Sequence, residues 1–81
     1  MTKEQLKEYI ECGNEIEFKY NNKMYSITYE TVNNKRFISF CEFYKKPINV
    51  KTFDELISIN YKGITVIQIW ETLTDNDVWI Y

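Results

Sequence analysis

EIEFKYNNKMYSITYETVNNKRFISFCEFY, residues 15–44, alternates apolar and polar side chains along three stretches that two Asn-Asn pairs separate. Such alternation is typical of half-buried strands. Asparagine tolerates the positive φ angles that two-residue hairpin turns require. The spacing therefore predicts a meander of three antiparallel strands, over about residues 14–20, 23–31 and 35–44.

The two-residue loops Asn21-Asn22 and Asn33-Asn34 fix the register of these strands, because each loop pairs the residues on either side of it. In that register apolar side chains meet on one side of the sheet throughout. The pairs are Phe18 with Tyr25, Ile16 with Ile27, Tyr29 with Ile38, and Ile27 with Phe40. A slip by one residue would turn every side chain to the opposite side. We therefore predict one continuous apolar face for helices to cover and a second face of mixed character.

Three threonines, each followed three residues later by Glu or Gln, predict helix starts, because this spacing lets the two side chains cap the first turn. The pairs are Thr2/Gln5, Thr52/Glu55 and Thr65/Gln68. They predict a helix over residues 3–12, which Gly13 can end, and a short helix over residues 53–59. Residues 63–73, GITVIQIWETL, favour a helix by their cap and apolar spacing, although their Val and Ile content leaves a strand open.

VWIY, residues 78–81, follows a turn and is short and β-prone, so we expect a further edge strand there. The predicted fold is α+β: a three-stranded antiparallel meander with a short C-terminal edge strand, an N-terminal helix, and one or two C-terminal helices packed on one face. No linker or repeat interrupts the pattern. Residues 1–81 are therefore predicted to form a single α+β domain.

The composition offers little for catalysis. The 81 residues include no histidine and only two cysteines, Cys12 and Cys41, which lack the spacing of a metal site. We therefore expect no enzyme activity, no metal and no cofactor, and we expect two reduced thiols. The first residues lack the apolar stretch of a signal peptide, and no run approaches the ~20 apolar residues of a membrane span. These features predict a cytoplasmic protein without membrane contact.

Glu42 is the one carboxylate on the predicted apolar face, opposite Tyr25. Burial there could raise the pKa of Glu42 towards the range of a general acid. Its place near the end of a strand favours the other interpretation, a solvated carboxylate bonded to a tyrosine hydroxyl.

The second face of the meander is the first candidate for recognition. Met24, Phe37 and Phe43 lie on it in the predicted register, and an apolar patch rimmed by charge is typical of a protein contact. The C-terminal segment could instead fold over this face. Pairing of an exposed edge, either strand 35–44 or VWIY, with its twin makes a homodimer possible. We expect Trp70 and Trp79 to be core anchors.

Single-stranded nucleic acid is the alternative partner. Basic side chains stand beside aromatic ones near the strand ends and turns, as in proteins whose lysines follow phosphates while rings stack on bases. The candidates are Lys23, Lys35, Arg36, Lys45 and Lys46. The net charge of −2 argues against a dedicated nucleic-acid binder, which is usually strongly basic.

Three segments, ISFCEFYKKP, TFDELISI and GITVIQIWETL, resemble small uncharacterised proteins of low-GC Gram-positive bacteria and their prophages. The resemblance implies no activity and no site residues. It implies a context, because small acidic proteins of mobile elements often act by binding a host or phage protein. The expected function is therefore that of a small cytosolic, non-enzymatic protein-binding module.

Overall fold

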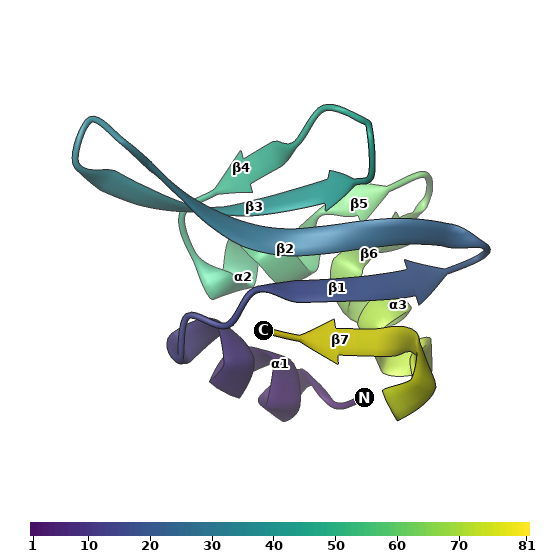
Figure 1. The fold of residues 1–81 in the computed structure, drawn as a ribbon. Helices are drawn as coiled ribbons and strands as arrows, with labels where there is room; N and C mark the ends of the chain where they lie inside the picture. The colour runs from purple at the N-terminus through teal and green to yellow at the C-terminus, as the bar shows by residue number, and fades with distance from the viewer.

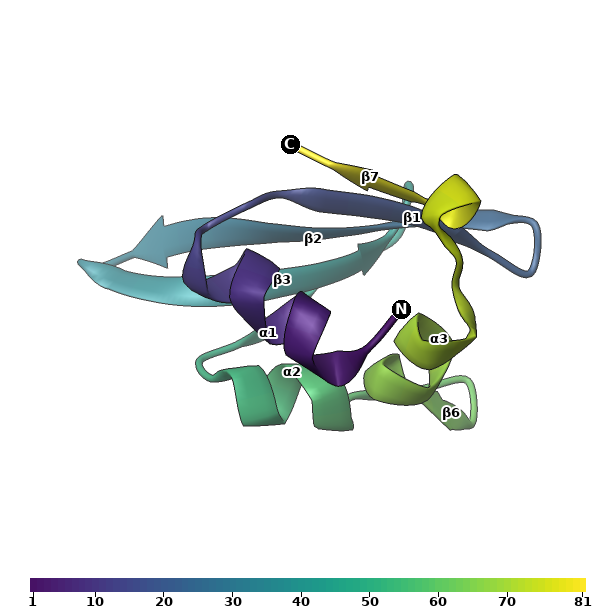
Figure 2. The same cartoon turned by 90° about the horizontal axis from the view of Figure 1, so that it is seen from below.

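The computed structural model describes residues 1–81 and places a sheet against a layer of helices (Figure 1). The helices are α1 (Lys3–Glu11), α2 (Phe53–Ser58) and α3 (Val66–Thr72), with one 3-10 turn, η1 (Asp75–Asp77). The strands are β1 (Ile16–Tyr20), β2 (Lys23–Val32), β3 (Lys35–Glu42), β4 (Ile48–Val50), β5 (Asn60–Tyr61), β6 (Ile64–Thr65) and β7 (Val78–Ile80). Figure 2 shows the three helices on one side of the large sheet, which confirms the predicted α+β class.

The large sheet is antiparallel and has the strand order β4-β3-β2-β1-β7. Its central meander has the predicted register, with Phe18 opposite Tyr25 and Ile27 opposite Phe40. All four asparagines of the two turns adopt positive φ angles, between 52° and 65°. The turn chemistry that sets the register is therefore the one that the sequence predicts.

All three predicted capping boxes form. At α1 the Gln5 amide donates to Thr2 Oγ1 at 3.1 Å, and the Thr2 amide donates to Gln5 Oε1 at 2.8 Å. Each cap satisfies two backbone donors that a helix start otherwise leaves free, and is worth about 1 kcal/mol. The helix favoured for residues 63–73 is confirmed from Val66 onward.

Strand β4 and the β5–β6 hairpin were not predicted. β4 pairs with residues 38–40 of β3, so β3 is an interior strand and the prediction that strand 35–44 offers a free edge is wrong. β3 also ends early, at Glu42, because the chain turns at Tyr44, which has a φ of 68°. The two-residue strands β5 and β6 form a small hairpin whose turn places Lys62 and Gly63 at positive φ.

One core of twelve buried apolar residues lies between the sheet and the helices. They are Leu6, Ile16, Phe18, Tyr25, Ile27, Ile38, Phe40, Leu56, Val66, Ile69, Trp70 and Leu73. The Trp70 ring meets the Phe18 ring edge-on, with centroids 6.4 Å apart, and its indole N–H donates to the Thr2 carbonyl at 2.7 Å. The prediction that Trp70 anchors the core is therefore confirmed.

Trp79 does not belong to the core, and the prediction that it anchors the core is wrong. The C-terminal strand forms as predicted, and β7 pairs with β1 at the edge of the sheet. Alternation along β7 places Val78 against the core and Trp79 on the opposite side, where it is 43% exposed.

Replacing Phe40 with alanine tests the core. Phe40 is fully buried, and its ring lies 5.7 Å from that of Tyr25 and 5.6 Å from that of Tyr61. We expect Phe40→Ala to lower the free energy of unfolding in urea by about 3–5 kcal/mol, because it leaves a cavity in the core. The exposed Val32 offers a control, since Val32→Ala should change it by less than about 0.5 kcal/mol. Similar losses for the two variants would contradict this packing.

Candidate functional site

One side of the large sheet carries no helix, and we name it the open face. Figures 1 and 2 together show the helices behind the sheet and β7 beside β1 rather than across the strands. The C-terminal segment therefore does not fold over this face, because β7 extends the sheet at its edge. The side chains of the open face are those of Glu15, Glu17, Lys19, Met24, Ser26, Thr28, Glu30, Val32, Lys35, Phe37, Ser39, Cys41, Phe43, Asn49, Trp79 and Tyr81.

Two aromatic side chains and two carboxylates lie together on the β1–β7 side of the open face. Glu17 is directly opposite Trp79, and the Tyr81 hydroxyl donates to Glu17 Oε1 at 2.9 Å. That hydrogen bond raises the pKa of Tyr81 above its usual value. Glu15 directly precedes β1 and, by alternation, lies on the same face as Glu17. Its backbone carbonyl accepts a hydrogen bond from the Tyr81 amide at 2.8 Å. Neither carboxylate forms an ion pair.

Of the three contact residues predicted from the sequence, the structure brings two together. The Phe43 amide donates to the Met24 carbonyl at 2.9 Å, and these two side chains line a hollow of about 450 Å³ with Tyr44, which is fully exposed. Phe37 pairs with Glu30. Glu30 is six residues from Met24 along β2, so Phe37 lies about 20 Å from Met24. Met24, Phe37 and Phe43 are all half-buried.

The sequence did not identify Trp79 and Tyr81 as contact residues. Both are exposed aromatic side chains that lie next to Glu17 on the open face. Alternation within VWIY does place both on one side of a strand. The sequence does not say which strand they adjoin, because β7 reaches β1 across sixty residues of chain. Their exposure on the open face follows from that pairing alone.

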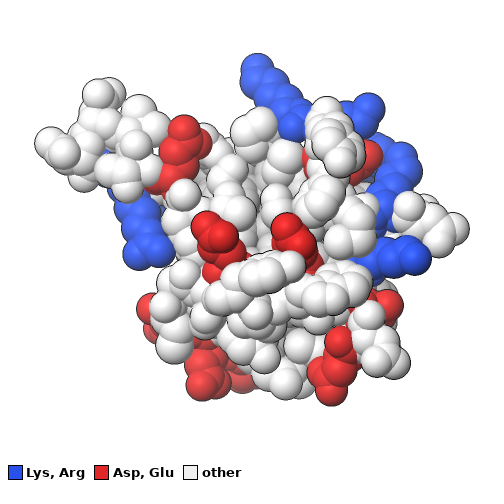
Figure 3. Space-filling view, in the orientation of Figure 1, with Lys and Arg blue, Asp and Glu red and all other residues white.

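The basic residues proposed for nucleic acid lie at two opposite ends of the sheet. Lys35 and Arg36 follow the second turn, and the Arg36 guanidinium stacks on the Tyr29 ring at 4.4 Å. Lys23 and the pair Lys45 and Lys46 lie at the other end. Figure 3 shows basic side chains towards the margins of this view and acidic ones near its middle. The structure therefore gathers these residues into no continuous basic track.

The buried carboxylate of Glu42 joins the sheet to the β5–β6 hairpin. We name Glu42 and the residues that contact its carboxylate, Lys23, Tyr61 and Lys62, the Glu42 cluster. Glu42 Oε1 accepts from the Tyr61 hydroxyl at 2.6 Å and from Lys62 Nζ at 3.2 Å. Lys23 Nζ lies 3.7 Å from Oε2. The Glu42 side chain is only 7% exposed. The predicted bond to a tyrosine hydroxyl is present, but the carboxylate is buried and not solvated.

The pKa of Glu42 moves downward, which excludes the less favoured of the two interpretations, a pKa raised by burial. The Tyr61 hydrogen bond is the largest cause, and Lys62 and Lys23 lower the pKa further. Burial acts in the opposite direction and is outweighed. The carboxylate therefore stays ionised at neutral pH, where it accepts hydrogen bonds and does not donate a proton.

The cysteines and acidic residues form no metal-binding group. Cys12 is exposed, Cys41 is half-buried, and both are free. The Cys41 thiol contacts the carbonyls of Glu42 at 3.0 Å and Lys45 at 3.1 Å. No three side chains of the metal-ligating types come together in a position to hold an ion. None of the helices has the length and apolar character needed to cross a membrane.

Glu42→Gln is expected to reduce the loss of stability in acid. Because the folded-state pKa of Glu42 lies below its ordinary value of 4.5, its ionisation stabilises the fold above pH 4.5. That contribution disappears as the pH falls through the lower folded-state value. Urea unfolding between about pH 3 and 7 should therefore show a steeper decline below pH 4.5 for the unmodified protein than for Glu42→Gln.

Glu71→Gln is the matched control, because Glu71 is exposed on α3 and takes no part in an ion pair. The Glu71→Gln variant should lose stability below pH 4.5 as steeply as the unmodified protein does. Equal declines for the unmodified protein and Glu42→Gln would mean that the Glu42 cluster contributes no pH-dependent stability.

Comparison of the chain with protein-family models, with curated proteins and with solved structures found no match.

Proposed function

We propose that this domain is a protein-binding module that receives, on its open face, a partner segment in which arginine or lysine alternates with apolar side chains. The observation that carries the proposal is the group formed by Glu15, Glu17, Trp79 and Tyr81. These residues combine carboxylates that form no ion pair with exposed rings on a surface that no helix covers.

The chemistry of this group suits a guanidinium. A carboxylate accepts two parallel hydrogen bonds from arginine, and such charge-assisted bonds are about twice as strong as neutral ones. A cation above an aromatic ring adds about 0.5–2 kcal/mol. Glu17 and Trp79 are direct partners on the neighbouring strands β1 and β7, so one guanidinium could contact both side chains. The rings of Trp79 and Tyr81 offer apolar area to the neighbouring residues of the same segment.

The charge of the open face selects the sign of the partner. Glu15, Glu17 and Glu30 lie on it with two cations, Lys19 and Lys35. Lys35 pairs with Val32, six residues along β2 from the partner of Glu17, so it lies about 20 Å from the Glu15 and Glu17 carboxylates. A second copy placed face to face would oppose these carboxylates to one another, which disfavours a homodimer through this surface. A basic segment from another protein pairs with them. The partner is therefore heterologous.

The edges of the sheet favour recognition by side chains over addition of a strand. β4 and β7, the two edge strands, have three residues each. So short an edge offers few free backbone groups to a partner. The open face, which spans five strands, offers far more contact area.

The proposal includes a cytoplasmic, non-enzymatic role. Two free cysteines fit a reducing compartment. The resemblance to small prophage proteins adds that the partner is a host protein bound during the life of a mobile element.

Trp79 reports on binding to the open face directly. Trp70 is buried, so a change in tryptophan emission on titration arises from Trp79. We expect a peptide that alternates Arg with Val to shift this emission to shorter wavelength and to saturate. A peptide that alternates Glu with Val should not. The double variant Glu15→Gln/Glu17→Gln should bind the Arg peptide about tenfold more weakly.

The matched control is Glu4→Gln/Glu8→Gln, which removes the same charge from α1 on the far side of the sheet. It should bind as the unmodified protein does. Equal binding of the two peptides, or full binding by the open-face variant, would refute the proposal. So would a stable dimer in light scattering that Trp79→Ala dissociates, because a second copy would then cover the face.

A further inference from the structure

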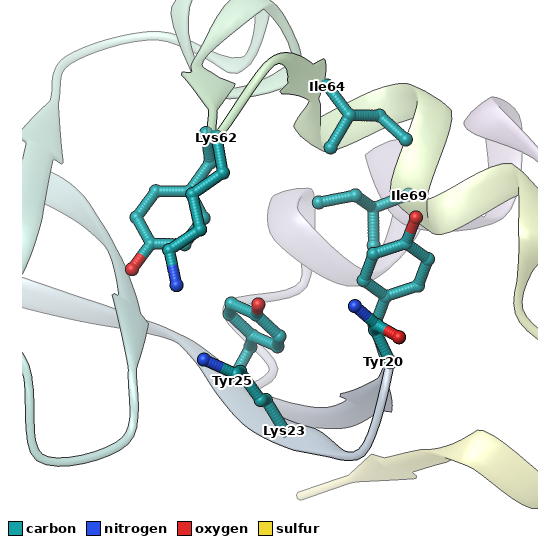
Figure 4. A pocket seen from close by; sticks show the side chains of 8 residues that line it. Tyr20, Lys23, Tyr25, Lys62, Ile64 and Ile69 are labelled. Atoms are coloured by element: carbon teal, nitrogen blue, oxygen red, sulfur yellow. The ribbon is translucent and has the colours of Figure 1, made fainter.

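A pocket of about 240 Å³ opens at one end of the molecule, between the β1–β2 turn and the β5–β6 hairpin (Figure 4). It lies on the helix side of the sheet, so it is separate from the open face. Its lining residues are Tyr20, Asn21, Lys23, Tyr25, Tyr61, Lys62, Ile64 and Ile69. The pocket combines cations, phenol hydroxyls and an aliphatic wall.

Tyr25 supplies a hydroxyl that nothing in the protein satisfies. The residue is only 3% exposed, and its hydroxyl makes no hydrogen bond within the chain. Since every fully buried polar side-chain atom of the protein has a partner, this hydroxyl reaches the space of the pocket. Figure 4 shows it at the pocket end of the ring. A hydroxyl so placed is satisfied by a ligand or by water.

The Tyr25 hydroxyl is also held in place. Its ring stacks on those of Phe18 and Phe40, with centroids 5.3 Å and 5.7 Å away and interplanar angles of 14° and 12°. The Tyr61 ring meets it edge-on at 5.9 Å. A donor fixed by packing on three sides loses little freedom when it binds a ligand.

The charges around the pocket leave one positive charge uncompensated. Lys23 and Lys62 both approach Glu42, so two ammonium groups share one carboxylate. Lys62 uses one of its three donors on Glu42, and Lys23, at 3.7 Å, makes no hydrogen bond to it. Several N–H donors of the two lysines thus remain free beside the Tyr25 hydroxyl.

Ile64 and Ile69 provide the other side of the pocket. An aliphatic wall opposite two ammonium groups suits a ligand with an apolar end and an anionic end. A volume of about 240 Å³ corresponds to about eight water molecules, and it lies below the ~300–1,000 Å³ of most small-molecule sites. The ligand is therefore small.

We propose that this pocket binds a small monocarboxylate with an aromatic or branched aliphatic group. The carboxylate accepts from the Tyr25 hydroxyl and the ammonium groups of Lys23 and Lys62, and the apolar group lies against Ile64 and Ile69. A monoanion matches the single surplus positive charge, whereas a phosphate monoester would bring an excess of negative charge next to Glu42. The same chemistry occurs in free organic acids and at the C-terminal residue of a peptide.

Titration with phenylacetate, followed by backbone amide shifts in NMR, tests this pocket. We expect saturable shifts at Asn21, Tyr25 and Lys62. Phenylacetamide, which has the same shape without the charge, should bind about tenfold more weakly or worse. A pentapeptide that ends in Phe with a free carboxylate, compared with its amidated form, identifies the source. If the pentapeptide with the free carboxylate binds more tightly than phenylacetate, the ligand of the pocket is the C-terminus of a chain. If it binds more weakly, the ligand is a free organic acid.

Two variants make the test specific. Tyr25→Phe keeps the ring packing and removes only the hydroxyl, so it should fold normally and bind phenylacetate about three- to tenfold more weakly. Lys62→Gln should weaken binding about tenfold, and the exposed Lys45→Gln, outside the pocket, should not change it. Equal affinities for phenylacetate and phenylacetamide, or no saturable shift, would overturn the proposal. Unchanged binding by both Tyr25→Phe and Lys62→Gln would also overturn it. None of these outcomes depends on peptide binding at the open face.

Discussion

The positive φ angles of four asparagines are the constraint on which the rest of the structure depends. Asn21, Asn22, Asn33 and Asn34 make both meander turns two residues long, and this length fixes which residues face each other. Alternation then assigns every side chain of the three strands to one face. The apolar series goes to the helices, and the acidic and aromatic series goes to the open face. A register shift of one residue would exchange the two surfaces and leave the domain with no core.

The Glu42 cluster is the second link between local structure and function. The β5–β6 hairpin has only two residues per strand, so its own backbone pairing cannot hold it firmly. Tyr61 and Lys62 fix it to the sheet through hydrogen bonds to a buried carboxylate. Because the hairpin also carries one wall of the pocket, the contacts that stabilise the fold also shape the pocket. The lowered pKa of Glu42 keeps the charge that both roles require.

Local signals were readable from the sequence, and long-range ones were not. The asparagine turns predicted the meander and its register, and the threonine caps predicted three helix starts, because each signal lies within a few residues. β4 was missed because it has only three residues and directly follows Pro47, and proline usually marks the end of a strand. The exposure of Trp79 was missed because it depends on the pairing of β7 with β1, far away in the chain. The burial of Glu42 was missed for the same reason, since its main partner, Tyr61, comes from a hairpin that no local pattern predicts.

The alternation of β2 explains how one thin sheet can carry two unlike surfaces. Tyr25 points to the core side and contributes its hydroxyl to the pocket, while its neighbours Met24 and Ser26 point to the open face. The open face is acidic on its β1–β7 side, and the pocket keeps an uncompensated cation, so the two surfaces attract ligands of opposite charge. In a chain with a net charge of only −2, the separation of charge between faces matters more than the total. A substitution at one position of β2 changes one surface and spares the other, which makes the two proposed sites separable by mutation even though a single strand forms part of both.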